Sequence, residues 1–443
     1  MARQIDFKSL GLGLCLVSQA GAFCGFYVAK AGTDLFNQAS KVVLVRDENK
    51  TVITMANDFE GDAKNFALVV PVPEVLSKEQ IHVTENKYVD HLDAYTSPRL
   101  VEYFDEDPCR SIRLRKMLMF KESKLGAGNG VLDDTQDLGV KVEAQYSVEE
   151  YDVMILSGKE SQGLLTWLRQ EGYALPEAAA PVVESYLKQG LFFFVAKVNL
   201  DKMALRADKY LRPLQVAFES PKFSLPVRLG TVNSKGTQDL FVFALTKKGR
   251  VEATNYRTLK IPSGQELPVY VKNDFSAFYR DMYAEVVRKE GMDKLYLEYA
   301  WDMGWCDPCA ADPLTKQELV NLGVFWDTGA GDALVRGQNV YVTRLHARYT
   351  AESFPADIQF QVTPNKENFQ GRYILRHPWA GNSQCEAQKK YHQALPKRQE
   401  QEAQSLARLT GWDINEIRQK ANLPKGSKEK PEKTPFWEKI WKK

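Results

Sequence analysis

Short runs of β-favouring hydrophobic residues, separated by polar or proline-containing segments, dominate the first 270 residues. Residues 42–46 and 51–55 flank a polar tetrapeptide, which predicts a β-hairpin. Residues 65–73 are almost continuously apolar, so we expect a central strand whose pairing ends at its prolines. Further strands are predicted within 140–157, 190–200, 214–219, 227–229, 239–246 and 269–271.

Helical spacing of apolar residues follows in other segments. The clearest case is 275–289, with Asp274 as the expected cap and Gly291 as the expected stop. Other helices are predicted over 87–104 (broken at Pro98), 164–169, 177–188, a stretch from Asp312 to Leu322, and an exposed segment over 384–409.

These patterns predict an α+β protein with β-rich, mostly antiparallel sheets, several amphipathic helices and a helical C-terminal segment. We expect four regions along the chain. They are a signal peptide over 1–22, a β-rich main domain over 23–290, a smaller α+β region over 291–385, and a helical, partly disordered basic tail over 386–443.

Composition narrows the functional classes. The chain is 44% hydrophobic and its formal charge is only +2, so nothing indicates a nucleic-acid partner. Arg3 and Lys8 precede a short apolar run that is too short to span a bilayer. Small residues follow, which predicts signal-peptide cleavage after Ala22 and an exported, periplasmic or secreted protein. No later segment is long enough for a transmembrane helix.

Export changes the interpretation of the cysteines, because thiols outside the cytosol tend to be oxidised. The disulfide candidates are Cys24, Cys109, Cys306, Cys309 and Cys385. We expect Cys24 to pair with Cys109, and Cys385 to pair with Cys306 or Cys309. A bond between Cys306 and Cys309 is the alternative, and it would be more strained and more easily reduced.

Several separated motifs resemble an uncharacterised family of exported bacterial proteins, domain of unknown function 2330, over about residues 23–330. The resemblance implies an exported, disulfide-permissive α+β protein and no known activity. It is carried by residues 23–30, 66–73, 98–109, 151–153, 167–173 and 226–242.

The segment 305–309 (Trp-Cys-Asp-Pro-Cys) is locally similar to the active-site motif of thioredoxin-like oxidoreductases. Pro313 follows so closely that the next helix should begin after both cysteines, which removes the helix dipole from Cys306. The same spacing suits zinc, with His377, Cys385 and His392 as irregularly spaced further ligands. A structural disulfide framework is the favoured interpretation, and no cofactor or metal is expected.

Other candidate groups have simpler explanations. Glu102, Asp105, Glu106 and Asp107 are expected to form a solvated acidic face, and His346, within a β pattern, is expected to be packed or at the surface. In the tail, Phe436, Trp437 and Trp441 lie among lysines, which could give a weak membrane-surface or protein contact.

We therefore expect an exported cell-envelope protein with a non-enzymatic binding or scaffolding role and an unknown partner. The alternative is a thiol–disulfide oxidoreductase with Cys306 as nucleophile and Cys309 as resolving thiol.

Overall fold

The computed structural model describes residues 26–30, 36–60, 66–109, 142–156, 173–174, 179–199, 202, 211–232, 236–305, 307, 312–326, 339–382 and 385–423. The expected signal peptide, the helix over 164–169 and the aromatic tail lie outside these residues.

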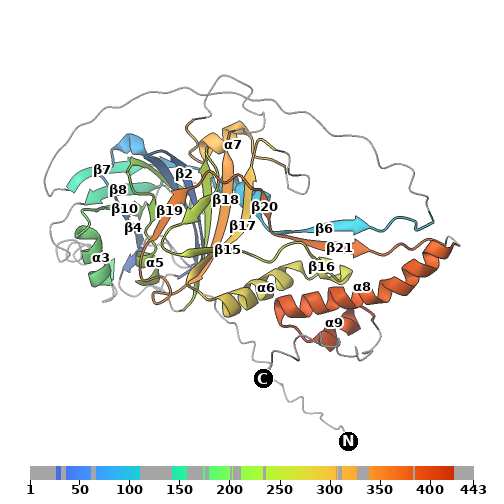
Figure 1. Ribbon diagram of the computed structural model, residues 1–443. Helices are drawn as coiled ribbons and strands as arrows, with labels where there is room; N and C mark the ends of the chain where they lie inside the picture. The colour runs from blue at the N-terminus through green and yellow to red at the C-terminus, as the bar shows by residue number, and fades with distance from the viewer. Residues whose placement is uncertain are drawn as a thin grey trace, which may run out of the picture.

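Two sheets form the body of the molecule (Figure 1). The six-stranded sheet is antiparallel, in the order β7 (Val142–Val148), β8 (Tyr151–Leu156), β10 (Phe192–Val198), β4 (Phe66–Val72), β1 (Phe26–Lys30) and β9 (Tyr173–Ala174). The nine-stranded sheet runs β15 (Arg257–Lys260), β17 (Lys294–Asp302), β18 (Tyr341–Tyr349), β13 (Gln238–Thr246), β2 (Phe36–Asp47), β3 (Lys50–Glu60), β11 (Leu214–Glu219) and β5 (Ile81–Val83), and β20 (Phe369–Gln370) pairs with β17.

The inner faces of the two sheets share one hydrophobic core. Val70 of β4 and Phe194 of β10 belong to the same buried cluster as Val42 of β2 and Leu345 of β18. Burial of apolar side chains on both inner faces is what holds two stacked sheets together. The body is therefore a sandwich of two sheets.

Helices cover the outer faces. α3 (Ala179–Leu187) and α5 (Arg228–Val232) pack on the six-stranded sheet, with Val183 and Leu229 buried. α1 (Asn86–Thr96) and α7 (Lys316–Asn321) pack on the nine-stranded sheet. α6 (Phe275–Glu290), α8 (Glu386–Thr410) and α9 (Ile414–Lys420) form a fourth cluster with Tyr296 of β17.

Two small sheets complete the structure. One joins β12 (Ser224–Leu225), β19 (Ile358–Val362) and β14 (Val251–Ala253). The other joins β16 (Gln265–Leu267), β21 (Arg372–His377) and β6 (Arg99–Phe104) in parallel, and its β6–β21 ribbon extends away from the sandwich toward the start of α8 (Figure 1). Short 3-10 turns occur at η1 (Lys78–Gln80) and η2 (Val269–Lys272).

The α+β class is confirmed, with mostly antiparallel pairing; β2–β13, β15–β17 and the β16–β21–β6 sheet are the parallel exceptions. The β2–β3 hairpin is confirmed, and Glu48 in its turn has a positive φ of 52°. β4 is central because it pairs with β10 on one side and β1 on the other. α6 begins after Asp274 and ends at Gly291, as its pattern predicts.

Four local predictions are wrong. Residues 99–104 form β6 rather than a helical turn, because β21 supplies a partner strand. Residues 227–229 and 269–271 adopt helical turns at α5 and η2 instead of strands. α7 begins after Thr315 rather than at Pro313, because Thr315 and Glu318 form a reciprocal capping box.

The regional boundaries also differ from expectation. Strands β17 and β18 lie beyond residue 290 yet belong to the same sheet as β2 and β3, so a boundary there would cut through a hydrogen-bonded sheet. The predicted exposed helix is α8, but its second half buries Ala403, Leu406 and Leu409 against α6 and its neighbours. Among the described residues, none of the helices is long and apolar enough to cross a membrane.

A disulfide closes the outer end of the β6–β21 ribbon. It joins Cys109 to Cys385, which immediately precedes α8, across 276 positions of sequence. The expected pairings of Cys109 with Cys24 and of Cys385 with Cys306 or Cys309 are therefore wrong. The parallel register of β6 and β21, which sets Phe104 opposite His377, brings the two distant segments together.

Replacing both cysteines, Cys109→Ser with Cys385→Ser, should lower the free energy of unfolding by about 2–5 kcal/mol, because the bond restricts the unfolded chain over a long loop. Urea unfolding measures the loss, and Cys24→Ser serves as the control that leaves stability within about 0.5 kcal/mol. Non-reducing peptide mapping that joins Cys24 to Cys109 would contradict the pairing.

Candidate functional site

The Trp-Cys-Asp-Pro-Cys motif is anchored through its aspartate. Asp307 is only 9% exposed, and its Oδ2 accepts hydrogen bonds from the Tyr299 hydroxyl (3.0 Å) and the Gln370 amide (2.8 Å). Burial raises the pKa of Tyr299 far above its ordinary value, so the phenol stays a neutral donor. Trp305 is 66% exposed. Cys306 and Cys309 lie outside the described residues, as does Cys24.

The acidic group near Cys109 is not simply a solvated face. The Asp105 carboxylate accepts hydrogen bonds from Tyr391 (2.6 Å) and Arg398 (2.7 Å), both on α8. Glu102 on β6 accepts a hydrogen bond from His377 on β21 (2.7 Å). These carboxylates attach the ribbon to its neighbours, so their role in the fold is structural.

A chain of alternating charges lies buried on the outer face of the nine-stranded sheet. Glu298 of β17 is completely buried, and Arg344 of β18 donates from Nε to its Oε2 at 2.5 Å. Arg344 also bonds Asp93 of α1, and Asp93 pairs with Lys41 of β2 at 2.8 Å. Tyr279 of α6 donates its hydroxyl to Glu298.

His346 continues this chain. Its Nδ1 lies 2.8 Å from Glu298 and its Nε2 lies 3.1 Å from Asp239, which also pairs with Arg348. Burial alone would lower the pKa of His346, but the two carboxylates outweigh it and the pKa is raised. Burial likewise opposes ionisation of Glu298, yet Arg344 and His346 lower its pKa to about 2. Both ring nitrogens therefore act as donors of an imidazolium.

This network has the groups of an acid–base centre but no room for a substrate. The Tyr283 ring stacks on His346 at 3.7 Å and the Phe241 ring at 4.1 Å, on opposite faces of the imidazole. Carboxylates occupy both ring nitrogens. We assign the network to the stability of the sheet. Of the two environments expected for His346, packed or at the surface, the structure shows the packed one.

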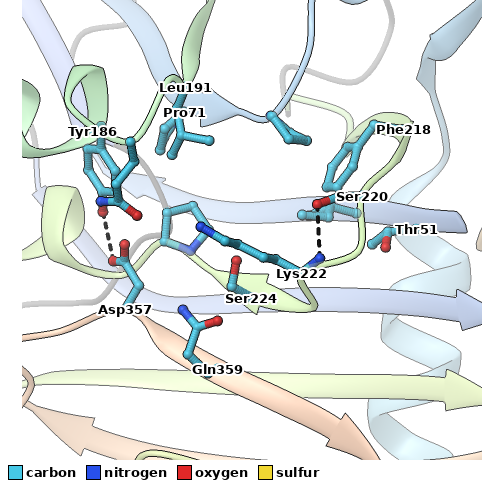
Figure 2. A pocket seen from close by; sticks show the side chains of 14 residues that line it. Thr51, Pro71, Tyr186, Leu191, Phe218, Ser220, Lys222, Ser224, Asp357 and Gln359 are labelled. Carbon is cyan, nitrogen blue, oxygen red and sulfur yellow. Dashed lines mark hydrogen bonds between the residues drawn. The ribbon is translucent and has the colours of Figure 1, made fainter. Parts of the chain in front are cut away.

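A cleft at one edge of the sandwich is a better candidate for binding. It has a volume of about 350 Å³ and lies where the ends of β3, β4 and β11 meet β12, β19 and the α3–β10 turn (Figure 2). Its lining is formed by Thr51, Ile53, Pro71, Pro73, Tyr186, Gln189, Leu191, Phe218, Ser220, Lys222, Ser224, Pro226, Asp357 and Gln359.

One end of the cleft is held rigid by Asp357. Its Oδ1 accepts hydrogen bonds from the Tyr186 hydroxyl (2.7 Å) and from the backbone N–H groups of Val227 (3.0 Å) and Arg228 (3.3 Å). Burial raises the pKa of Asp357 despite these donors. The carboxylate thus ties α3, α5 and β19 together at this wall of the cleft.

The rest of the cleft combines apolar surfaces with free polar groups. Three prolines, Leu191 and Phe218 supply rigid apolar walls. The exposed side chain of Lys222 lies across the cleft (Figure 2), and no hydrogen bond or ion pair engages its ammonium among the described residues. Ser224 and the neighbouring Gln359 supply a hydroxyl and an amide on paired strands. The arrangement suits a ligand with an apolar body and an anionic group.

Sequence reasoning found none of these lining residues. The prolines at 71 and 73 appeared only as the end of a strand, and the segment 220–225 only as a connection between strands. The signal in the sequence that could have indicated a binding site was the segment 220–226, in which serines and a lysine lie among prolines between two strands. It carries no information about the distant segments that complete the cleft, such as Asp357.

The replacement Glu298→Gln should lower the free energy of unfolding at pH 7 by about 3–5 kcal/mol, because it removes the buried carboxylate that Arg344 and His346 share. The exposed Glu219→Gln is the control, with a change within about 0.5 kcal/mol.

The raised pKa of His346 gives stability that is complete below pH 6.5 and is lost as pH rises through that pKa. Urea unfolding at several pH values should show this loss in the parent and a weaker one in the variant; equal profiles would contradict the assignment.

Comparison with known proteins bears on the chain as a whole. A model of the family described as uncharacterised proteins conserved in bacteria, DUF2330, matches residues 18–361. No curated protein and no solved structure was found to match the chain. The matched segment includes every strand of the two large sheets except β20, and all residues that line the cleft. The chain therefore belongs to the bacterial family DUF2330, domain of unknown function 2330.

Proposed function

We propose that this protein is an exported binding protein of the bacterial cell envelope, whose ligand occupies the cleft at the edge of the sandwich. The cleft itself is the observation that supports this proposal. Its volume of about 350 Å³ falls within the range of small-molecule sites, and its walls combine apolar side chains with polar ones in similar number.

The chemistry of the cleft favours binding over catalysis. Asp357 accepts three hydrogen bonds from its own protein, so it is poorly placed to take a proton from a ligand. No histidine or cysteine stands among the lining residues, and among the described residues no hydrogen bond joins the hydroxyl of Ser220 or Ser224 to a carboxylate or amine side chain that could activate it. Lys222 remains as a cation that can pair with a ligand anion.

The size and polarity of the cleft describe the ligand. Leu191, Phe218 and the prolines favour a ligand with an apolar portion, because covering these apolar surfaces removes them from water. Lys222, which lies across the cleft, favours an acidic group, carboxylate or sulfonate, on the same molecule. A small amphiphilic acid fits both requirements.

Two features support export. The first residues carry the basic, apolar and small-residue regions of a signal peptide. The Cys109–Cys385 bond needs an oxidising compartment to persist, which the periplasm or the exterior of the cell provides.

Binding in the cleft should be visible with 8-anilinonaphthalene-1-sulfonate, a fluorescent probe with an aromatic body and one anionic group. We expect one site per chain, with affinity reduced about three- to tenfold by Lys222→Ala and essentially lost in Ser224→Phe, which fills the cleft. The exposed Lys78→Ala is the matched control and should bind as the parent does. Equal affinity in the parent and in Ser224→Phe would exclude the cleft as the site.

Export predicts a defined mature end. Mass spectrometry of the protein isolated from its native host should find Phe23 as the first residue, because cleavage is expected after Ala22. Recovery of intact chains that begin at Met1, in the cytoplasmic fraction, would contradict export.

A further inference from the structure

A second cavity, which shares no lining residue with the cleft, lies where the β6–β21 ribbon meets α8 and α9. Its volume is about 270 Å³. It is enclosed by the end of β21, the start of η2, one side of α8 and the end of α9. The lining residues are Pro268, Val269, Tyr270, Arg376, His377, Pro378, Gln399, Glu402, Lys420, Ala421, Asn422 and Leu423.

Glu402 is the unusual group of this cavity. It is only 5% exposed, and its Oε1 accepts no hydrogen bond from any described residue. The nearest cation is Arg398 of the preceding helical turn, whose Nε lies 3.3 Å from Oε1 without forming a hydrogen bond. The buried hydroxyl of Tyr270, on another wall, is likewise without a described partner. Two unsatisfied oxygens at one cavity are a costly arrangement unless something binds there.

The basic groups around the cavity already pair with other acids, and Lys272 joins His377 at Glu102. The pairs are Arg398 with Asp105 (2.7 Å), Arg376 with Glu266 (2.8 Å), Lys420 with Asp274 (3.5 Å) and His377 with Glu102 (2.7 Å). The cation beside Glu402, Arg398, is hydrogen-bonded to Asp105 at 2.7 Å and lies 3.3 Å from the Glu402 carboxylate. Among the described residues, Glu402 therefore has no cation that serves it alone.

We propose that this cavity binds a primary ammonium group on a short alkyl chain, with the Glu402 carboxylate and the Tyr270 hydroxyl as its acceptors. An ammonium carries a positive charge and three donors, which suits a carboxylate and a hydroxyl that both lack a described donor. The side-chain carbonyls of Gln399 and Asn422 line the same space and can accept its third hydrogen. The alkyl portion has Val269 and Leu423 as apolar neighbours.

The charge state of Glu402 makes this binding depend on pH. Burial raises the pKa of Glu402 to about 7, partly opposed by Arg398 and Arg376 and reinforced by Glu266 and Asp105. An alkylammonium stays charged well above pH 8, so its affinity follows ionisation of the carboxylate. Without the ligand, a raised pKa favours the folded state below pH 4.5 and loses that contribution as pH rises through 7.

Isothermal titration of the full mature chain with pentylammonium chloride at constant ionic strength tests the site. We expect one site, bound about tenfold more tightly at pH 8 than at pH 6, because the ionised fraction of a group with a pKa near 7 changes by that factor. Glu402→Gln should abolish the binding and its pH dependence while keeping the fold, since the amide resembles the protonated acid. Glu416→Gln, an exposed acid on α9, should bind as the parent does.

Tyr270→Phe removes one oxygen only and should weaken binding about three- to tenfold at pH 8. It keeps the proposal testable if the Glu402 variant unfolds. Absence of heat at pH 8 from the folded parent would overturn the proposal, and so would equal affinity in the parent and in Glu402→Gln. These outcomes leave the sulfonate probe in the first cleft unaffected, so the two sites are tested separately.

Discussion

The charge of Glu298 constrains the whole nine-stranded sheet. A carboxylate with no exposed surface can remain ionised only if cations are built around it, and Arg344 and His346 supply them from the neighbouring strand. His346 in turn requires Asp239 on the next strand. A slip of one residue between β17 and β18 would turn Glu298 into the apolar interior of the sandwich, so the network specifies the register.

This register also sets what the two faces of the sheet can do. On the outer face the network and the rings of Phe241 and Tyr283 leave no access for a ligand. On the inner face Leu297 and Leu345 join the core shared with the six-stranded sheet. Concave space therefore remains at the edge of the sandwich, where strands end and prolines prevent further pairing.

The outer end of the β6–β21 ribbon and of α8 is held mainly by polar contacts and a disulfide, because few apolar side chains are buried there. The first half of α8 is mainly exposed, and it is attached to the ribbon through Asp105 and the Cys109–Cys385 bond. The second half is buried among α6 and α9. Glu402 lies where the exposed first half of α8 gives way to its buried second half. This position explains how the acid can be buried there with incomplete pairing.

The sequence by itself determined the elements whose signals are local: the β2–β3 hairpin, the apolar strands β4 and β10, and α6 between Asp274 and Gly291. It also indicated the α+β class. Only the tertiary structure decided that residues 99–104 are a strand, that Cys109 pairs with Cys385, and that Asp357 and Lys222 share one cleft. Strand partners, disulfides and cavities join residues more than a hundred positions apart, and their free energy depends on contacts that no local pattern of polarity encodes.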